Sequence, residues 1–509
     1  AYGVPFARIS PKVADPKVVE LLPRDFLEKQ CVLPLFLVQN KLTLAVHEPA
    51  NVFLAEEVER LTGYPVQVVA ATAKDIQNTL QNHLPNANIF VIDDVVDDIK
   101  AEELSLVEQQ TSDLHDIETS ANDSPVIKLV NYLIYAAVQE SASDIHIEPG
   151  DQELRVRYRI DGRLHEKMTP PHQMLPAVVS RVKIMAGLDI SERRMPQDGA
   201  ICVMINKRQI DLRVSTMPGK FGEKVVIRVI DKNKAMTSLE KLGFAYEMLQ
   251  TYRSVIRQPN GIILVTGPTG SGKSTTLYAT LNEINDEALN VSTVEDPVEY
   301  NLAGINQFQT NDRAGFTFPA ALRSLLRQDP DVIMVGEVRD EQTARIATQA
   351  ALTGHLVFST LHTNDAPSAV TRLFNIGVEP YLVAAAIRAV LAQRLVRKIC
   401  SSCKEPSEPS AQEKRTIQRM DPDGEVPEML YHGVGCSKCR STGYAGRIGI
   451  CELFVPSAES LDAIARGATL QELRNRARHD GFLTLRQDGL EKVRAGLTTI
   501  DELVTATAV

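Results

Sequence analysis

Residues 267–274 fill every position of the phosphate-binding pattern G-x-x-x-x-G-K-[ST]. Its glycines let consecutive backbone N–H groups turn toward phosphate oxygens, and a following helix adds partial positive charge. Lys273 is placed to reach the β- and γ-phosphates, and the Ser274 hydroxyl is placed to bind Mg²⁺. The pattern therefore predicts a site for ATP or GTP made by Gly267, Pro268, Thr269, Gly270, Ser271, Gly272, Lys273, Ser274 and Thr275.

The sequence on both sides of this pattern agrees with it. Residues 262–265 form a short apolar run typical of a buried parallel strand, and residues 274–285 have helical spacing. A chance glycine-rich turn would require neither element. We therefore prefer the phosphate loop to that alternative.

Two acidic segments follow further expected strands at 291–294 and 332–335. They are Glu295-Asp296-Pro297-Val298-Glu299 and Gly336-Glu337-Val338-Arg339-Asp340. An ATPase needs one carboxylate to organise Mg²⁺ and another to orient or deprotonate water, and Glu295 and Glu337 are the candidates. For Glu299 and Asp340 a helix cap or a surface charge is favoured. Glycine stands where a Walker B aspartate is expected, so the choice of base between the two glutamates stays open.

Histidines flank a fourth expected strand at 356–360. His355 ends the run Thr353-Gly354-His355 before this strand, and His362 follows it. A shared metal is the weaker interpretation, because no Cys or carboxylate stands at ligand spacing around the two histidines. We expect both to act in catalysis as sensors of the γ-phosphate.

Four cysteines form two Cys-x-x-Cys pairs, Cys400 with Cys403 and Cys436 with Cys439, separated by 32 residues. In a chain without a secretion signal this spacing predicts a tetrahedral Zn²⁺ site rather than disulfides, with reduced thiols as the alternative. The site would be structural. Its loss is expected to leave nucleotide binding intact, because we expect the phosphate loop on a different, independently packed sheet.

The composition is that of an ordinary globular protein. Hydrophobic residues make up 44% of the 509 residues, no apolar run reaches the about 18 residues that span a bilayer, and no charged-then-apolar signal opens the chain. We expect a soluble, cytoplasmic protein, and the first residue, Ala1, indicates a processed or truncated start. Residues 93–119 hold ten Asp and Glu against one Lys, which is most of the net charge of −10, so no dominant basic surface favours nucleic acid.

The length allows about three domains. The patterns predict a small α/β domain at 1–92, an acidic linker at 93–120, a second domain at 121–234 with a half-buried strand at 154–160, and a doubly wound parallel sheet at 239–509 that includes a cysteine segment at 396–444. The predicted fold class is therefore α/β, with a P-loop ATPase domain in the C-terminal half.

Four motifs occur in the order found in one family: the phosphate loop, the segments at Glu295 and Glu337, and the histidine segment that ends Leu361-His362-Thr363. The chain resembles the secretion or traffic ATPases, specifically the type II secretion and type IV pilus extension motors, which name these motifs Walker A, Asp box, Walker B and His box. Residues 143–148 and 196–199 also resemble the second domain of this family. The tetracysteine insertion resembles extension and secretion motors rather than retraction motors or the type IV secretion branch.

The resemblance implies a RecA-like ATPase domain preceded by an α+β, PAS-like domain and a partner-binding N-terminal domain, with a Cys₄ zinc subdomain. It implies ATP, Mg²⁺ and Zn²⁺ as cofactors, and a homohexamer with ATP between the second and the ATPase domains. Arg213 and Arg228 match family arginines that reach the phosphates, although each is also simply a charged strand residue. The implied partners are an inner-membrane platform protein and a cytoplasmic recruiting protein, with peripheral association at the inner membrane and no nucleic acid.

The function implied by the resemblance is the assembly of a pilin-like fibre driven by ATP hydrolysis, in type II secretion or type IV pilus formation. Two other functions stay open. One is a nucleic-acid translocase of the same P-loop class, which DNA-stimulated ATPase activity would favour. The other is a nucleotide-sensing regulatory module, in which the N-terminal domain receives a second messenger and ATP is only a switch.

Overall fold

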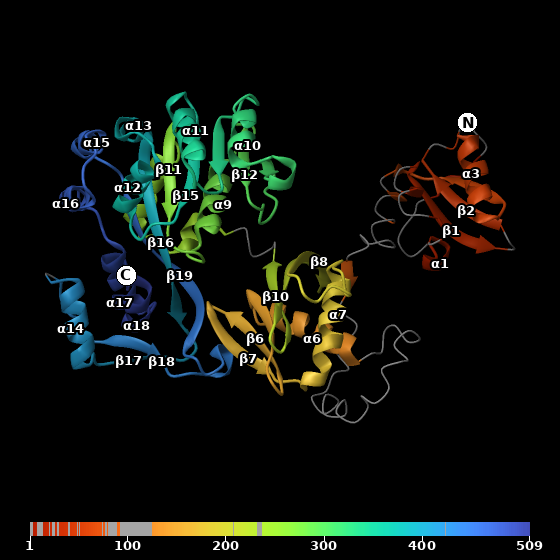
Figure 1. Cartoon of the computed structure of the whole chain (residues 1–509), viewed down its shortest axis with the longest axis horizontal. Helices are drawn as coiled ribbons and strands as arrows, with labels where there is room; N and C mark the ends of the chain where they lie inside the picture. Colours follow the sequence, from red (N-terminus) through yellow and green to blue (C-terminus); the bar gives the residue numbers. More distant parts are fainter. Residues whose placement is uncertain are drawn as a thin grey trace. The chain divides into compact units, whose positions relative to one another are not determined.

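The computed structural model describes residues 4–508 apart from 8–13, 20, 23–25, 28–29, 39–40, 48, 50, 74, 77–78, 80–88, 92–124, 207, 232–236 and 423. The acidic segment predicted at 93–120 lies outside the described residues. The chain divides into two compact units, one made by Ala1–Tyr158 with Glu166–Val229 and the other by Arg159–His165 with Ile230–Val509. Figure 1 shows their helices and strands.

The first sheet along the chain has three strands in the order β1-β2-β3. Strand β1 (Val32–Val38) runs antiparallel to β2 (Lys41–Val46), and β2 runs parallel to β3 (Val66–Ala70). Helices α1 (Pro16–Val19) and α3 (Val52–Thr62) accompany these strands. Leucines of β1 and β2 share one core with Val19 of α1 and Val58 of α3, so the apolar faces of these short elements cover one another.

The second sheet has seven strands in the order β4-β8-β9-β10-β5-β6-β7. Its elements are β4 (Ile89–Val91), α6 (Pro125–Gln139), β5 (Asp144–Pro149), β6 (Leu154–Ile160), β7 (Arg163–Met168), η3 (His172–Met174), α7 (Leu175–Met185), β8 (Gln197–Ile205), β9 (Arg208–Gly219) and β10 (Gly222–Asp231). The predicted alternation in β6 is confirmed, since Leu154, Val156, Tyr158 and Ile160 are buried. The Tyr158 hydroxyl donates to the Leu133 carbonyl at 2.7 Å, which fixes α6 on this face.

The third sheet has the order β13-β12-β14-β15-β11-β16-β19. Its strands are β11 (Gly261–Thr266), β12 (Val291–Glu295), β13 (Asn306–Gln309), β14 (Val332–Val335), β15 (Leu356–Leu361), β16 (Ile387–Ile399) and β19 (Tyr444–Phe454). All neighbouring strands run parallel except β19, which is antiparallel to β16. The four strands predicted from the sequence are confirmed as β11, β12, β14 and β15.

Helices cover both faces of this sheet, as the side chains of β11 show. Ile262 and Leu264 pack with α10 (Phe318–Leu325), α11 (Glu341–Leu352) and α12 (Ala366–Ile376), whereas Ile263 and Val265 pack with α8 (Tyr246–Val255) and α9 (Lys273–Ile284). The first layer also holds α13 (Pro380–Ala386), α15 (Ala458–Ala465) and α16 (Leu470–His479); the 3-10 turns are η5 (Leu239–Leu242) and η6 (Asp312–Ala314). The predicted doubly wound α/β fold is therefore confirmed.

A smaller core lies where β16 and β19 continue beyond the other strands. Val396 of β16 and Ile450 of β19 pack with Ile417, Leu490 and Leu503. The elements here are β17 (Lys404–Ser407), α14 (Ala411–Met420), β18 (Leu430–Gly433), η7 (Ser437–Cys439), α17 (Leu485–Arg494) and α18 (Ile500–Thr507), with β17 antiparallel to β18. The segment between the cysteine pairs forms a sheet of its own, β17–β18, as we expected. It is not independent of the phosphate-loop sheet, because β16 pairs with β11 and leads directly into Cys400.

Candidate active site and metal centre

The predicted phosphate loop connects β11 to α9, in the strand–loop–helix context that the sequence indicated. Gly267, Gly270 and Gly272 have φ values of 147°, 79° and 90°. A Cβ on Gly267 would come within 2.5 Å of the Gln393 carbonyl oxygen, so only glycine fits where the loop passes β16. Pro268, Thr269 and Gly270 are exposed, and so is Ser274 in the first turn of α9.

Lys273 is the first residue of α9 and folds back over this loop. Its ammonium group donates to the carbonyl oxygens of Gly267 at 2.9 Å and Pro268 at 3.0 Å. Burial lowers the pKa of Lys273, the negative charge of Glu337 raises it, and Arg394 lowers it further. The buried Ser271 hydroxyl has no hydrogen-bond partner among the described residues, so a polar atom in the loop is left for a ligand to satisfy.

Glu337 and His362 join Lys273 at the carboxyl edge of the sheet. One carboxylate oxygen of Glu337 lies 2.5 Å from the Arg339 guanidinium, and the other lies 3.7 Å from Nε2 of His362. Burial lowers the pKa of His362, and the positive charge of Lys273 lowers it further, which favours the neutral imidazole. A carboxylate, an ammonium group and a neutral imidazole thus form one electrostatic group beside the phosphate loop.

Glu295 occupies a different environment at the end of β12. Its side chain is buried, with one oxygen accepting from the Tyr278 hydroxyl and the other accepting from Thr293 Oγ1 at 2.6 Å and Gln307 Nε2 at 3.1 Å. None of these three donors belongs to the phosphate loop. Because Tyr278 lies on α9, Glu295 connects this helix to β12 and β13. The sequence left open which of Glu295 and Glu337 is the catalytic base. The structure distinguishes them, because the carboxylate of Glu295 is bound by side chains outside the phosphate loop, whereas Glu337 lies beside Lys273.

His355 lies apart from the phosphate loop within the described chain. Its Nδ1 is 3.0 Å from the Ala350 carbonyl oxygen, and its own carbonyl accepts from the N–H of Gly261, the first residue of β11. His355 therefore stands at the amino edge of the sheet, whereas His362 stands at the carboxyl edge. The six residues of β15 separate these edges by about 20 Å. Sequence proximity to the strand could not distinguish its two ends.

Two of the remaining predicted polar residues, Asp340 and Arg228, contact other parts of the protein. Asp340 is the N-cap of α11 and accepts from the Thr343 N–H at 2.8 Å, as we favoured. Arg228 on β10 forms an ion pair with Asp144 at 3.3 Å, and Arg213 lies on the neighbouring strand β9 with its side chain half-buried. A contact of either arginine with nucleotide stays a prediction.

The four predicted cysteines come together in one cluster. Their Sγ atoms all lie within 4.8 Å of one another. Three separations are 3.9 Å for Cys400–Cys436, 3.7 Å for Cys403–Cys439 and 3.7 Å for Cys436–Cys439. Thiolates at about 2.3 Å from one Zn²⁺ form a tetrahedron with edges of about 3.8 Å. The arrangement fits a closed Cys₄ zinc site.

Backbone donors favour a thiolate in this cluster. The N–H groups of Cys436 and Gly443 donate to Cys439 Sγ at 3.1 Å and 3.3 Å. Burial raises the pKa of Cys439, but these hydrogen bonds, together with those from the thiols of Cys436 and Cys403, outweigh it and lower the pKa to about 6. The thiolate is the form that binds metals, so the local backbone prepares this side chain for a cation.

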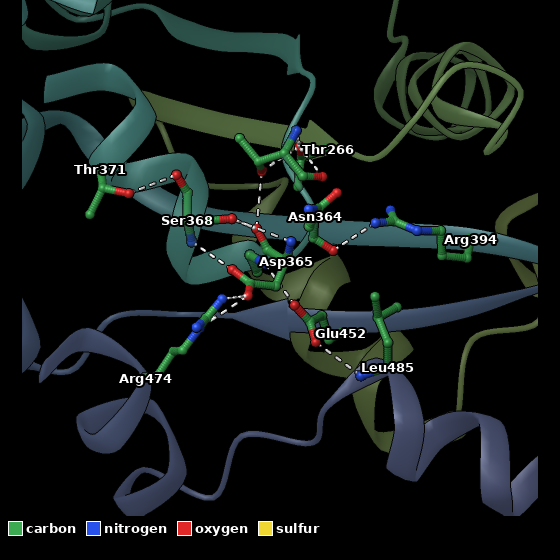
Figure 2. Close-up of polar contacts among 11 residues, drawn as sticks. Thr266, Asn364, Asp365, Ser368, Thr371, Arg394, Glu452, Arg474 and Leu485 are labelled. Carbon is green, nitrogen blue, oxygen red and sulfur yellow. Dashed lines mark hydrogen bonds and ion pairs between the residues drawn. The ribbon is translucent and has the colours of Figure 1, made fainter. Parts of the chain in front are cut away.

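The sequence analysis missed the residues of β16 that adjoin the phosphate loop. Gln393 Oε1 accepts from Thr276 Oγ1 of α9 at 2.6 Å, and Arg394 donates to the Asn364 carbonyl oxygen at 2.8 Å. Figure 2 shows Arg394 reaching this loop after β15. The signal was a polar pair, Gln-Arg, inside an apolar run from Ala389 to Val396, where a strand buried on both faces would otherwise hold aliphatic residues.

Comparison with known proteins assigns the chain. Residues 119–505 match the family described as Type II/IV secretion system protein, and residues 2–88 match the MshEN domain. The chain belongs to the Type II/IV secretion system protein family. It is an ATP hydrolase, as the phosphate loop predicted. The predicted resemblance to the secretion and pilus ATPases is confirmed.

Relatives of this secretion-family chain come from two kinds of system. The type IV pilus assembly ATPase PilB of Myxococcus xanthus is 43% identical over 100% of this chain and 89% of its own length. The type II secretion system protein E of Dickeya dadantii is 43% identical over 97% of this chain and 98% of its own. The type II secretion system ATPase E of Vibrio cholerae is 48% identical over 77% of each chain.

Solved structures support the fold of this secretion-family chain. The crystal structure of the pilus retraction motor PilT with bound ADP has a TM-score of 0.51 at 25% identity, covering 74% of this chain and 96% of that chain. The ATPase DotB of Legionella pneumophila has a TM-score of 0.55 at 21% identity, covering 75% of this chain and 95% of that chain, and supports the fold alone. Among the described residues, no helix has the length and apolar character needed to cross a membrane.

Proposed function

We propose that the chain is the ATPase that drives assembly of a pilin-like fibre in a type II secretion or type IV pilus system. The observation that supports this most is the grouping of Lys273, Glu337 and His362 around the phosphate loop. The relatives PilB and protein E belong by name to the two systems, so the proposal is for the work that both would share.

In this proposal the phosphates of ATP lie on the phosphate loop. Lys273 exchanges its bonds with the Gly267 and Pro268 carbonyl oxygens for bonds with the β- and γ-phosphates. The exposed Ser274 hydroxyl would hold Mg²⁺, which supplies positive charge to the phosphate oxygens. The N-terminus of α9 adds partial positive charge near the same phosphate oxygens.

Glu337 is the proposed base that orients the attacking water and accepts its proton. Its ion pair with Arg339 holds the carboxylate in place, and its negative charge raises the pKa of the nearby Lys273. His362, with its lowered pKa, would be neutral at physiological pH and donate one N–H to the γ-phosphate. Glu295 would act indirectly, because its oxygens are bound by Tyr278, Thr293 and Gln307.

The assembly in this proposal is a homohexamer in the cytoplasm, held at the inner membrane by a platform protein and a recruiting protein. Arg213 and Arg228, neighbours on β9 and β10, would reach the phosphates from the second domain. Arg228, which is 61% exposed, would exchange its ion pair with Asp144 for a phosphate. Zn²⁺ in the Cys₄ cluster would have no open coordination position and would serve structure only.

The test of this proposal is the Glu337→Gln variant in an ATPase assay. We expect it to bind ATP normally and to lose about 10²- to 10⁴-fold in kcat, since a positioned base is removed. Glu341→Gln is the matched control, because Glu341 lies four residues further along, is 58% exposed and pairs with Arg345. Normal turnover in Glu337→Gln would contradict the proposed role of Glu337. Lys273→Ala tests the phosphate loop separately, and we expect it to lose ATP binding.

A further inference from the structure

Four charged side chains lie together on one face of the ATPase sheet (Figure 2). Arg394 comes from β16, Glu452 from β19, Asp365 from the N-cap of α12 and Arg474 from α16. Residues 362–365 follow β15, and we call them the β15 loop. Asp365 is the last residue of this loop, and the other three side chains lie beside it. None of the four has a part in the hydrolysis described above.

Arg394 lies between the β15 loop and the phosphate loop. Its side chain is only 8% exposed, and Nη2 donates to the Asn364 carbonyl oxygen at 2.8 Å. Its Nη1 lies beside the phosphate loop, since a Cβ built on Gly267 would come within 3.1 Å of it. Burial lowers the pKa of Arg394, while Glu452 and Asp365 raise it. One guanidinium group therefore adjoins both loops.

The start of the β15 loop is attached to the strand that precedes the phosphate loop. Thr266, the last residue of β11, accepts from the Thr363 N–H at 2.9 Å, and the two threonine hydroxyls lie 2.7 Å apart. The Thr363 hydroxyl also lies 3.0 Å from the Asp365 carbonyl oxygen. His362 stands immediately before this attachment, so its position follows that of the loop.

The end of the β15 loop is fixed to the C-terminal helices. Asp365 accepts from the Ser368 N–H at 2.8 Å and forms an ion pair with Arg474 of α16. Glu452 accepts from the N–H groups of Ala366 at 2.6 Å and Leu485 at 2.9 Å, at the first residues of α12 and α17. Between these two attachments, Arg394 bonds to the carbonyl oxygen of Asn364 in the middle of the loop while its Nη1 lies beside Gly267.

We propose that Arg394 is a positioning residue for ATP hydrolysis, which holds the β15 loop against the phosphate loop so that His362 faces the γ-phosphate. The inference rests on the proposed function, because it takes His362 to act at the phosphate. A guanidinium suits this task because its planar fork donates at fixed angles to the Asn364 carbonyl oxygen of the β15 loop and to the Gln393 carbonyl oxygen beside Gly267, whereas lysine offers one point charge. Arg394 bonds to protein carbonyl groups, so its loss affects the rate of hydrolysis more than the affinity for nucleotide.

The first experiment compares Arg394→Lys with a control on the same strand. Arg394→Lys is expected to lower kcat by about 10- to 100-fold while the KM for ATP and the Kd for ADP stay within about threefold. The control is Arg388→Lys at the amino end of β16, where Arg388 bonds to the backbone and side-chain oxygens of Asn260 at 3.1 Å and 3.0 Å. Normal kcat in Arg394→Lys, or weaker ADP binding that indicates direct phosphate contact, would overturn the inference.

A double-mutant cycle with His362→Ala tests the route of the effect. Arg394 is proposed to act through the loop that carries His362. In the His362→Ala background, Arg394→Lys should therefore lower kcat by less than about threefold. Fully additive losses would overturn the inference. A His362→Ala protein with normal kcat would instead contradict the proposed function, whereas an impaired His362→Ala beside a normal Arg394→Lys contradicts only the role of Arg394.

Hydrogen exchange separates local positioning from general unfolding. In Arg394→Lys the peptide that covers the β15 loop should exchange faster, because the Asn364 carbonyl loses its bond to Arg394 and the neighbouring bond from the Thr363 N–H to Thr266 opens more often, while α9 keeps its protection. Arg388→Lys should change neither segment. Faster exchange throughout both segments in Arg394→Lys would show a packing role and overturn the inference.

Discussion

The hydroxyl of Tyr278 donates a hydrogen bond to the carboxylate of Glu295, and this bond joins α9, the helix after the phosphate loop, to β12, the next strand along the chain. Burial raises the pKa of Tyr278, and the charge of Glu295 raises it further, so the phenol stays protonated and serves as the donor. The Tyr278 ring also packs edge-on against Tyr300, with ring centroids 4.5 Å apart. Donor and acceptor are thus held in place by packing as well as by charge.

Tyr278→Phe should destabilise the ATPase unit. The substitution keeps the ring but leaves one oxygen of a buried carboxylate without its donor, which costs about 1–3 kcal/mol in the free energy of unfolding. Chemical denaturation measures this cost, and Tyr381→Phe, at a tyrosine that is 61% exposed, is the control. Equal stability of Tyr278→Phe and the wild type would show that the bond is not formed.

Glu295→Gln should differ in kind from Glu337→Gln. The amide places an N–H₂ group among the donors of Tyr278, Thr293 and Gln307, so we expect lower stability and a kcat within about tenfold of wild type. The measurement pairs denaturation with steady-state ATPase rates for both variants. A stable Glu295→Gln protein with a kcat as low as that of Glu337→Gln would contradict the structural role and show that Glu295 acts in catalysis.

Glu452 should make stability depend on pH in a defined direction. Burial raises the pKa of Glu452 to about 7, and the hydrogen bonds from Ala366 and Leu485 only partly oppose this. Below about pH 4.5 the carboxyl is protonated in both folded and unfolded chains, and as pH rises through 7 only the folded chain resists ionisation. The contribution of this group to stability is therefore lost between those values.

The measurement is the stability of the wild type minus that of Glu452→Gln, followed from pH 5 to pH 8. We expect this difference to fall as pH rises and to level off above pH 7, by an amount on the order of 3 kcal/mol at most. Both proteins share every other titrating group, so the difference isolates Glu452. A difference that does not vary with pH would mean that Glu452 titrates in its ordinary range.

Cys400→Ser should release zinc and loosen the segment that the metal holds. Removing one of four ligands opens the shell, and the folding free energy that the metal supplies is lost locally. Elemental analysis gives the zinc content, and hydrogen exchange of β17 and β18 reports the loosening. Cys202→Ser on β8 is the control, since Cys202 lies outside the cluster. Protein purified without chelator that contains no zinc would contradict the site.

Local patterns predicted the parts of the active site that depend on neighbours in sequence. The phosphate loop, the strands β11, β12, β14 and β15, and the cap at Asp340 follow from apolar runs, glycines and N-cap residues within a few positions of one another. The cluster of four cysteines could also be predicted, because two Cys-x-x-Cys pairs are a sequence signature of a metal site.

Contacts between distant segments were beyond the sequence. Glu295 and Glu337 both follow strands, and only the side chains that arrive from α9 and β13 distinguish a bound carboxylate from an available one. His355 and His362 flank the same strand, and only its direction in the sheet puts one of them near Lys273. Arg394 lies 121 residues after Lys273, and no local pattern links the two.

Strand β16 is thirteen residues long and connects the sheet of the phosphate loop to the cysteine cluster. It pairs with β11 from Ile387 to Ala392 and with β19 from Val390 to Ile399, and Cys400 follows at once. An extended strand held by hydrogen bonds along its length transmits tension, because stretching it would break its ladder. A displacement of the cysteine cluster along the strand would therefore reach Gln393 and Arg394 beside the phosphate loop, so β16 mechanically connects the cysteine cluster to the ATPase site.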